Sequence, residues 1–581
     1  MRRSIPAEFP NPCVVVPGYT LMDRLILLLP ALPLASALLI HLTAGTLRHR
    51  VARISQVANL LTFLLAATLL GLSLSGEAPA LHRFGSHWGS LLFDPLSVLM
   101  AVVISGISYI VHVYSIRYMA EEPGYTRFFI LLDLMTAALL VMVAAGDLIM
   151  LLLAWHIIGV VLYFLLGQDT RSHTAYRYAF WTFFTYRIGD LPMVLAAILL
   201  YQAFGTWSLP EIFAHIAAAP ATTTLFGLPL TETVGLLVGL AAFARSAQFL
   251  LHTWLPYSMD GPTPVSALMH AGIVNAGGFI INRFAPVYMH TGEALHWIFF
   301  VGLVTSIIGS VLMLTQNDIK KSLGYSTMGQ MGFMIMECGV GAFSLAIYHL
   351  IAHGLFKGTL FLGAGSVINE ARQSDNVPKD DLYTFIVERR PARQRQQPWL
   401  LMAAITLAVP AVVFALAHWL VAGDFFQKQG AIVLLFFGWV TGAQLLFSTY
   451  RMRTQNLWRM VSMIVFSFTI VVLGYTLISH VFDLFLYPDR DMRLQIYAAA
   501  GVDFAWFLTL MILLTAIIVL GWLLTYYSER RQRYGKTRPG HHWMNFYALV
   551  SREFYIADIY SWLTRGLLRL AERLNVWLRW V

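Results

Sequence analysis

Charged side chains are scarce in this sequence. Only 12% of its 581 residues are Asp, Glu, Lys or Arg, whereas 58% are hydrophobic and the mean hydropathy is +0.67. Soluble globular chains carry about 25% charged residues. The sequence therefore predicts a protein whose solvent is lipid.

Cysteine is almost absent as well. The two cysteines, Cys13 and Cys338, lie far apart and form neither a disulfide framework nor a CxxC metal knuckle. We therefore expect no cofactor in this chain.

The apolar runs lack the alternation of barrel strands. In lipid every backbone N–H and C=O must be paired within its own segment, so these runs must be helices and the predicted fold is all-α. About fifteen runs are long enough to span the membrane. They start at Leu25, Val57, Leu91, Phe128, Leu148, Ala175, Val234, Val265, Ala294, Leu323, Ala342, Leu400, Ala431, Met460 and Phe504.

The formal net charge of +9 would suit a nucleic-acid partner, but the basic residues fall in short loops between apolar runs. We therefore expect the chain to contact membrane lipid and not to bind nucleic acid. By parity from the first span, the basic loops share one side, which is predicted to be cytoplasmic. They contain Arg48, Arg50 and Arg53, Arg117 and Arg127, Arg171, Lys320 and Lys321, Arg372 to Arg395, Arg451 and Arg453, and Arg530 to Arg538. The N-terminus should then face outward and the C-terminus the cytoplasm.

Several ionisable side chains fall inside predicted spans, where each needs a partner or a hydrated path. His156 in the fifth span is either a neutral, bonded imidazole or a proton-carrying site near the midplane. Arg187 and Asp190, three residues apart, share one helix face and form either an ion pair or part of a relay. Arg245 in the seventh span cannot lose its proton, so it can set a local potential but not carry protons.

Prolines interrupt the chain between two apolar runs. Pro256, Pro262 and Pro264 fall in the stretch 252–264, which predicts a broken helix lining a cavity. His270 follows at the start of the eighth span. Its neighbours Asn275 and Asn282 also need hydrogen-bond partners, which again indicates a hydrated interior.

His349, His353 and Lys357 recur every four residues, which places them on one stripe of the eleventh span. Two histidines at this spacing can bind zinc, but no cysteine or carboxylate in the same turn completes a ligand set, so no metal is expected. Titratable groups one helical turn apart suit a water-linked proton path.

From Phe93 to Ser366 the sequence resembles the antiporter-like subunits of respiratory complex I and the Mrp sodium/proton antiporters. The resemblance rests on seven motifs. They are 114–119, Arg187 to Asp190, 246–248, 261–268, Asp318 to Lys321 (which includes Lys320), 325–328, and His349 to Lys357. The family implies two inverted five-helix repeats, each with a broken helix, joined by a hydrated axis. Its ion path would include Asp318 and Lys320.

On this basis we divide the chain into an N-terminal tail, N-terminal spans, two antiporter-like repeats, C-terminal spans, and a basic loop with an amphipathic helix. The segments are 1–22, 23–127, 128–290, 291–450, 451–528 and 529–581. The amphipathic helix is expected to lie in the membrane interface, with docking onto a partner as the alternative.

Two positions depart from the proton-pumping relatives. Their Trp-Glu pair is replaced by Trp155 and His156, and a lysine by Arg245; their second Gly-Phe-x-Ser-Lys-Asp segment has no equivalent in 369–430. The run 270–286 and the stretch 330–339 instead resemble the DabB branch, membrane subunits of an inorganic-carbon accumulation complex. That resemblance implies a cytoplasmic partner, DabA, a zinc protein related to β-carbonic anhydrases that hydrates CO2.

We therefore expect a bacterial inner-membrane subunit, not itself an enzyme, that couples inward flow of protons or another cation to CO2 hydration by a zinc-containing partner. The alternatives are a proton-pumping subunit of a quinone oxidoreductase or Mrp-type antiporter, and a membrane scaffold whose polar residues only hold helices together. The predicted ion path consists of His156, Arg187, Asp190, Arg245, His270, Asp318, Lys320, His349, His353 and Lys357. If His156 replaces the relatives' glutamate, His156→Ala should abolish function while the complex stays assembled.

Overall fold

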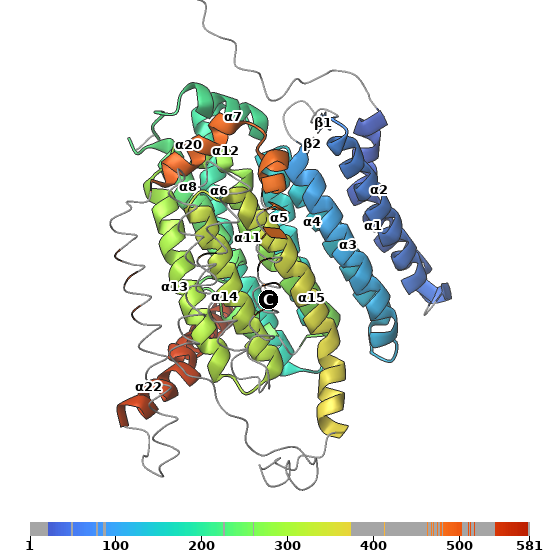
Figure 1. The fold of residues 1–581 in the computed structure, drawn as a ribbon. Coiled ribbons are helices and arrows are strands. Elements are labelled where there is room, and N and C mark those ends of the chain that lie inside the picture. Colours follow the sequence, from blue (N-terminus) through green and yellow to red (C-terminus); the bar gives the residue numbers. More distant parts are fainter. Residues whose placement is uncertain are drawn as a thin grey trace, which may run out of the picture.

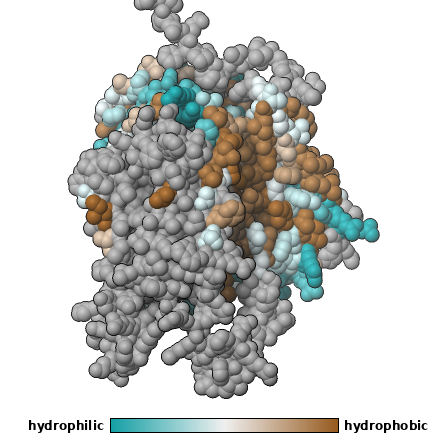
Figure 2. Space-filling view, viewed as in Figure 1, coloured by the Kyte–Doolittle hydropathy of each residue, from teal (hydrophilic) through white to brown (hydrophobic). Residues whose placement is uncertain are grey.

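The computed structural model describes residues 21–47, 50–76, 80–84, 89–224, 227–258, 261–373, 480–501 and 541–578, with scattered single residues between 412 and 516. These residues form a helical bundle in which most long helices run roughly side by side (Figure 1). Hydrophobic side chains gather in a band across the visible part of the bundle, and hydrophilic ones lie toward its ends (Figure 2). This distribution is that of a membrane-spanning protein.

Four helices begin the bundle. They are α1 (Leu21–Leu47), α2 (Val51–Leu74), α3 (Pro95–Tyr118) and α4 (Tyr125–Ala144). α1 packs against α2 and α4, and α2 also packs against α3. Between α2 and α3 a short hairpin pairs β1 (Ala80–Arg83) with β2 (Ser90–Phe93) in antiparallel register, Ala80 opposite Phe93. The hairpin lies at one end of the helices and adds a minor element to the predicted all-helical fold.

The central helices follow as α5 (Leu148–Leu166), α6 (His173–Phe204), α7 (Leu209–Ala218) and α8 (Leu230–Arg245). Side-chain caps fix where several helices start. The carboxylate of Asp147 accepts a hydrogen bond from the N–H of Met150 at 2.9 Å, and Asp94 caps α3 in the same way through Ser97. Such caps satisfy N–H groups that have no partner within the helix.

After α8 the helical path is interrupted several times. Short segments follow as α9 (Trp254–Tyr257), α10 (Thr263–Ala271), η3 (Ile273–Asn275), α11 (Ala276–Arg283) and α12 (Ala285–Tyr288). The first break begins directly after Arg245, six residues before the predicted proline-rich stretch. It contains two non-glycine residues of left-handed conformation, Ala247 (φ 48°) and Leu250 (φ 73°). This break is confirmed, and it starts deeper in the span than the prolines indicate.

Three long helices complete this part as α13 (Glu293–Thr315), α14 (Ile319–Gly339) and α15 (Phe343–Gln373). α13 and α14 approach closely because glycines face each other. A Cβ at Gly332 would lie 2.4 Å from the backbone nitrogen of Ser306, and one at Gly302 2.5 Å from that of Met336. Small residues at such contacts are the usual means of packing helices in lipid.

The eleven predicted spans from Leu25 to Ala342 each coincide with a helix or a pair of helix segments. Nine of the described helices are long and apolar enough to cross a membrane. The four predicted spans from Leu400 onward lie outside the described residues, so the count of fifteen stays a prediction. The same holds for the inverted repeats and segment boundaries, because the second repeat, predicted for 291–450, is described only to Gln373.

The C-terminal part includes α20 (Arg490–Ala500), α22 (His541–Ser551), η5 (Glu553–Tyr555) and α23 (Ile556–Leu578). α23 is the predicted amphipathic helix. Its first turns pack on this chain itself: Ile556 and Tyr560 are buried against Trp181 of α6, and the hydroxyl of Tyr560 donates to the carbonyl of Leu250 at 3.1 Å. Farther along, apolar side chains such as Trp562 and Leu568 stay exposed, as an interfacial helix requires.

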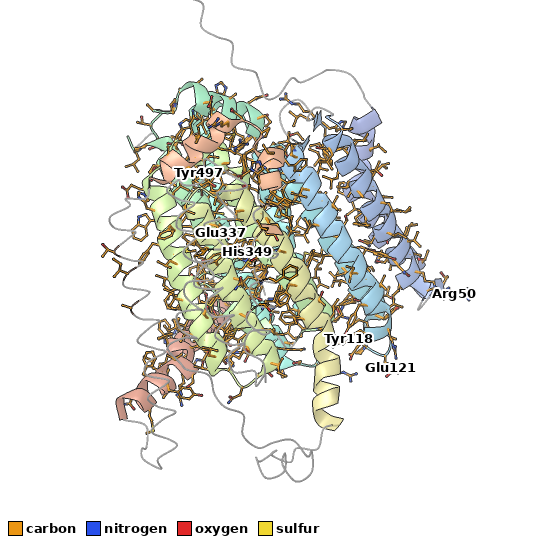
Figure 3. The ribbon with its side chains drawn as sticks, viewed as in Figure 1. Arg50, Tyr118, Glu121, Glu337, His349 and Tyr497 are labelled. Atoms are coloured by element: carbon orange, nitrogen blue, oxygen red, sulfur yellow. The ribbon has the colours of Figure 1, made fainter. Side chains whose placement is uncertain are left out.

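α23 lies at the end of the bundle that carries the basic loops. Glu553, just before it, forms an ion pair with Lys321 at the start of α14, and the hydroxyl of Tyr257 donates to Glu553 at 2.9 Å. Arg50, Tyr118 and Glu121 also lie toward this end, whereas Tyr497 lies at the other (Figure 3). The gathering of the basic loops on one side of the membrane, and that side's being cytoplasmic, stay predictions.

Candidate ion-conducting site

The first group of buried ionisable residues joins α5, α6 and α8. We call it the arginine cluster: His156, Arg187, Asp190 and Arg245. The carboxylate of Asp190 contacts Arg187 Nη2 at 2.9 Å, Arg245 Nη2 at 3.3 Å and His156 Nδ1 at 3.2 Å. Four predicted path residues from three helices thus meet at one carboxylate.

Arg245 is the most deeply enclosed member. It is 1% exposed and lies at the last turn of α8, where the helix break begins. Its guanidinium sits 4.4 Å from the Trp155 ring and 4.0 Å from the Tyr186 ring, and Nη2 also donates to the carbonyl of Trp155. Aromatic faces and a carboxylate thus balance a positive charge that cannot titrate.

His156 occupies the opposite side of this cluster. Its side chain is 53% exposed in the described structure, and Arg187 Nη1 lies 2.6 Å from its Nδ1. The same Nη1 lies 3.0 Å from Nε2, and Nδ1 also lies 3.2 Å from the Asp190 carboxylate, so the ring sits between a donor and an acceptor. His156 lies eight residues into α5, about 12 Å from the start of the helix and so near mid-span.

The second group lies on α15 and its neighbours α14 and α10. We call it the histidine row: Glu337, His349, His353, Lys357 and His270. His349 Nδ1 contacts the Glu337 carboxylate at 3.0 Å, and its Nε2 lies 3.1 Å from the side-chain oxygen of Gln330. Glu337 and His349 are labelled side by side in Figure 3. Both ring nitrogens therefore face oxygen atoms that can accept a hydrogen bond.

His353 continues the row one turn further along α15. Its ring centre lies 6.2 Å from that of His349, and the side chain is only 6% exposed. Neither ring nitrogen has a hydrogen-bond partner among the described residues. Buried imidazole nitrogens need a partner, so water is the expected link from His353 to its neighbours.

Lys357 and His270 end the row. The Lys357 ammonium, 2% exposed, donates to the hydroxyl of Ser326 at 2.8 Å, and His270 Nδ1 lies 3.1 Å from the hydroxyl of Thr327. Ser326 and Thr327 are adjacent on α14, so Lys357 of α15 and His270 of α10 contact the same turn of that helix. The predicted stripe is thus confirmed as a geometric row and extends onto α10 through His270.

The broken helices lie between the two groups. The hydroxyl of Ser246, directly after Arg245, donates to the carbonyl of Val274 at 2.7 Å, and the Asn275 amide donates to the carbonyl of Ala271 at 2.7 Å. A Cβ at Gly354, next to His353, would lie 2.5 Å from that same Ala271 oxygen. The helix breaks therefore connect the arginine cluster to the histidine row in space.

Two predicted path residues stand apart. Asp318 is exposed and caps α14 through the N–H of Lys321 at 2.8 Å, and Lys320 lies in the same first turn. The structure does not bring either residue into the cluster or the row. Their place in an ion path stays a prediction.

Glu337 and Gln330 were missed by the sequence analysis. A carboxylate inside a predicted span is a signal in itself, but its pairing with His349 depends on how α14 and α15 pack. Among the described residues no group of three His, Cys, Asp or Glu side chains could hold a metal ion.

Interrupted helices beside ionisable side chains inside the membrane are features of an antiporter-like membrane subunit. The comparisons with known proteins agree. Residues 145–443 match the family model "NADH:quinone oxidoreductase/Mrp antiporter, TM", and residues 84–129 match the N-terminal model of complex I chain 5. Among solved structures, the Mrp complex from Dietzia aligns over 94% of this chain and 60% of the other, with TM-score 0.53 and 22% identity. An archaeal sulfane sulfur reductase complex aligns over 87% and 97%, with TM-score 0.54 and 18% identity. These similarities concern the fold.

Sequence comparison gives a nearer relative. The chain is 59% identical to the "Probable inorganic carbon transporter subunit DabB1" of Halothiobacillus neapolitanus over 95% of this chain and 99% of that protein. A NAD(P)H-quinone oxidoreductase chain 5 of Picosynechococcus is 32% identical over 73% of this chain and 66% of its own length. The chain therefore belongs to the DabB family of antiporter-like membrane subunits.

Proposed function

We propose that this chain conducts protons inward through the membrane and thereby energises inorganic-carbon uptake by a complex of which it is one subunit. The histidine row carries this proposal. It places Glu337, His349, His353 and Lys357 in succession along two adjacent helices inside the membrane. Ionisable groups at this depth are costly, and a succession of them suits proton transfer better than helix packing.

The geometry within the row supports loading as well as transfer. His349 faces acceptors on both ring nitrogens, while neither ring nitrogen of His353 has a hydrogen-bond partner among the described residues. A proton taken up at His349 can thus pass to His353 by way of water and onward to Lys357 or His270.

The arginine cluster supplies the potential that biases this movement. Arg245 keeps its charge at all physiological pH values and lies at the break that leads toward the row. A fixed positive charge there repels protons from the axis unless Asp190 offsets it. Movement of Asp190 toward or away from Arg245 would therefore gate the path.

CO2 hydration would take place in a partner. The described residues include no set of zinc ligands, and the similar Halothiobacillus protein is named as a transporter subunit. We propose a cytoplasmic, zinc-containing partner of the DabA type, bound at the basic end of the bundle. This assignment places the protein in the bacterial inner membrane with its C-terminus in the cytoplasm.

Affinity purification in mild detergent tests the partnership. The tagged chain is isolated from its native membrane, its partners are identified by mass spectrometry and bound zinc is measured, with an unrelated tagged membrane protein as control. We expect one large partner related to carbonic anhydrases and zinc in proportion to it. Copurification of flavin, iron–sulfur or Mrp subunits would overturn the proposal.

A further inference from the structure

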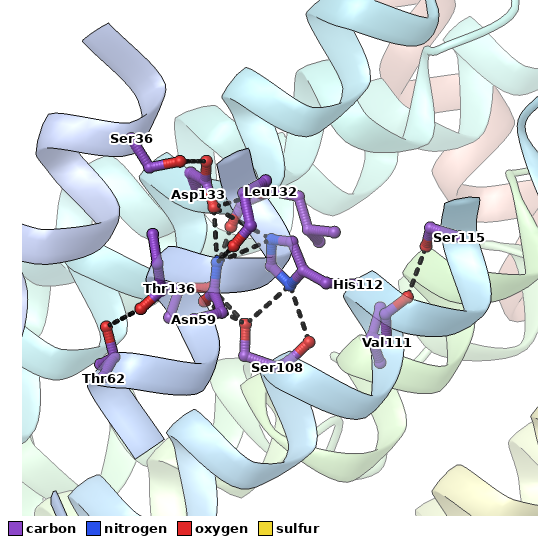
Figure 4. Close-up of polar contacts among 12 residues, drawn as sticks. Ser36, Asn59, Thr62, Ser108, Val111, His112, Ser115, Leu132, Asp133 and Thr136 are labelled. Carbon is purple, nitrogen blue, oxygen red and sulfur yellow. Dashed lines mark hydrogen bonds and ion pairs between the residues drawn. The ribbon is translucent and has the colours of Figure 1, made fainter. Parts of the chain in front are cut away.

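A third buried polar group lies in the N-terminal helices, apart from the cluster and the row. It consists of Asp133 and Thr136 of α4, Ser36 of α1, Ser55 and Asn59 of α2, and Ser108 and His112 of α3 (Figure 4). All seven side chains are at most 2% exposed. Asp133 lies eight residues into α4, about 12 Å from its start, and hence near mid-span. We call this group the Asp133 site.

The Asp133 carboxylate is surrounded by donors. The hydroxyl of Ser36 donates to Oδ2 at 2.7 Å, while the hydroxyl of Ser55 and the amide of Asn59 each donate to Oδ1 at 2.7 Å. His112 Nε2 lies 3.0 Å from the same Oδ1. Four helices thus converge on one carboxylate, which makes its ionised form tolerable in lipid.

The hydrogen bonds of Ser108 fix the proton on one nitrogen of His112. Thr136 donates to the carbonyl of Leu132 at 3.0 Å, so at its 2.5 Å contact with Ser108 it acts as the acceptor. The Ser108 hydroxyl proton is therefore not available to His112. His112 Nδ1 lies 2.7 Å from the Ser108 carbonyl oxygen, which only accepts, so Nδ1 carries a hydrogen.

The other nitrogen then requires a second proton. With Nδ1 protonated, an unprotonated Nε2 beside an ionised Asp133 would place two lone pairs 3.0 Å apart. The Asn59 amide nitrogen lies 2.9 Å from the Ser55 carbonyl, 2.7 Å from Oδ1 and 3.2 Å from Nε2, and its two hydrogens serve the two shorter contacts. The nearest partner left for Nε2 is Oδ1 at 3.0 Å, which favours one proton between them, either on the imidazole or on the carboxyl group.

We propose that the Asp133 site is a proton-binding site, in which Asp133 and His112 share one exchangeable proton. It goes beyond the proposed function because it lies outside the path from His349 to Lys357. Asp133 also falls between the segments that the two family models match, 84–129 and 145–443. Proton uptake breaks no bond between heavy atoms. The proton comes from water and is held by the lone pair of Nε2 or of Oδ1.

No other charged side chain among the described residues contacts the Asp133–His112 pair. In the described elements packed on α4, the other charged or basic side chains include His41 of α1, Arg53 of α2, Arg117 of α3 and His156 of α5. None of them forms a hydrogen bond or ion pair with Asp133 or His112 within the described structure. The protonation of the pair therefore follows the pH of the water that reaches it.

Infrared difference spectroscopy of the full-length chain in lipid nanodiscs tests the proposal. Spectra are recorded from acidic to alkaline pH in potassium buffers, and the carboxylic C=O band is assigned by its loss in Asp133→Asn. We expect this band to disappear as pH rises and to shift in His112→Gln, since the two residues share the proton. Spectra in which neither the Asp133 carboxyl band nor the imidazole bands lost in His112→Gln change at any pH at which the chain stays folded would overturn the proposal, because the pair would then hold no exchangeable proton.

A milder substitution covers the case in which Asp133→Asn does not fold. Ser55→Ala removes one donor to Oδ1 and so disfavours the ionised carboxylate; the band should persist to higher pH. Ser105→Ala is the matched control, because the Ser105 hydroxyl on α3 donates to the carbonyl of Ala101 and not to the site. An identical response of both variants would contradict the assignment, as would a band that responds to sodium and not to pH.

Discussion

The arginine cluster and the histidine row both place ionisable side chains inside spans, but the hydrogen-bond partners of their histidines differ. In the cluster, His156 Nδ1 faces the donor Arg187 at 2.6 Å; in the row, the two nitrogens of His349 face acceptors at 3.0 and 3.1 Å. Arg187 keeps a fixed positive charge beside His156, whereas the Glu337 carboxylate and the Gln330 side-chain oxygen, which face His349, only accept. We therefore expect the arginine cluster to hold a fixed charge and the histidine row to carry the moving proton.

The comparison suggests that the two regions respond differently to substitution. Changes in the row should reduce ion flow while the fold stays intact. Changes in the cluster should reduce stability and conduction together, because its arginines also hold three helices in place.

The largest effect is expected for Lys357→Met. This change keeps the length of the side chain but removes the ammonium that donates to Ser326 at 2.8 Å. Loss of a positioned proton carrier commonly costs about 100-fold or more in rate. Proton flux into proteoliposomes containing the complex should fall by about that factor. The thermal unfolding temperature should stay close to that of the wild type, and Arg171→Gln, at an exposed loop, should change neither quantity.

The sequence predicts that His156→Ala abolishes function, whereas the structure favours a loss smaller than the about 100-fold of a positioned proton carrier, because Asp190 keeps Arg187 and Arg245 as partners. The imidazole contacts both Asp190 and Arg187, and its loss frees Arg187 to pair more tightly with Asp190. The complex should remain assembled by size-exclusion chromatography. Unchanged flux in this variant would remove His156 from the path.

Glu337→Gln should lower flux by a smaller factor, several-fold at most. It keeps a hydrogen-bond acceptor near His349 but removes the anion that stabilises the protonated ring at 3.0 Å. Flux measured at one fixed pH gradient gives the comparison. A loss as large as that of Lys357→Met would mean that Glu337 itself carries the proton.

Arg245→Met should act mainly on stability. It leaves Asp190 with one arginine fewer, and breaking a buried ion pair costs about 3–5 kcal/mol. Because Asp190 is 13% exposed and keeps Arg187, we expect the lower part of that range. Unfolding in detergent followed by intrinsic fluorescence measures it. Arg245→Lys should recover most of the loss, and an unfolding curve unchanged in Arg245→Met would contradict the structural role of the cluster.

The sequence predicted the histidine row because a spacing of four residues is visible without knowing the fold. It could not predict that Glu337 pairs with His349, since that contact depends on the packing of α14 against α15. The break after Arg245 also gave no signal, because the left-handed residues Ala247 and Leu250 are not glycines. Asp133 was overlooked even though a carboxylate inside an apolar span is costly and needs partners.

The most direct test of the account measures proton entry and bicarbonate formation in the same vesicles. The complex is reconstituted, a proton gradient is imposed, and internal pH and bicarbonate are followed for the wild type and for His353→Leu. The account predicts that both signals fall together in the variant. Bicarbonate formed at the wild-type rate while proton entry through the variant is abolished would contradict it.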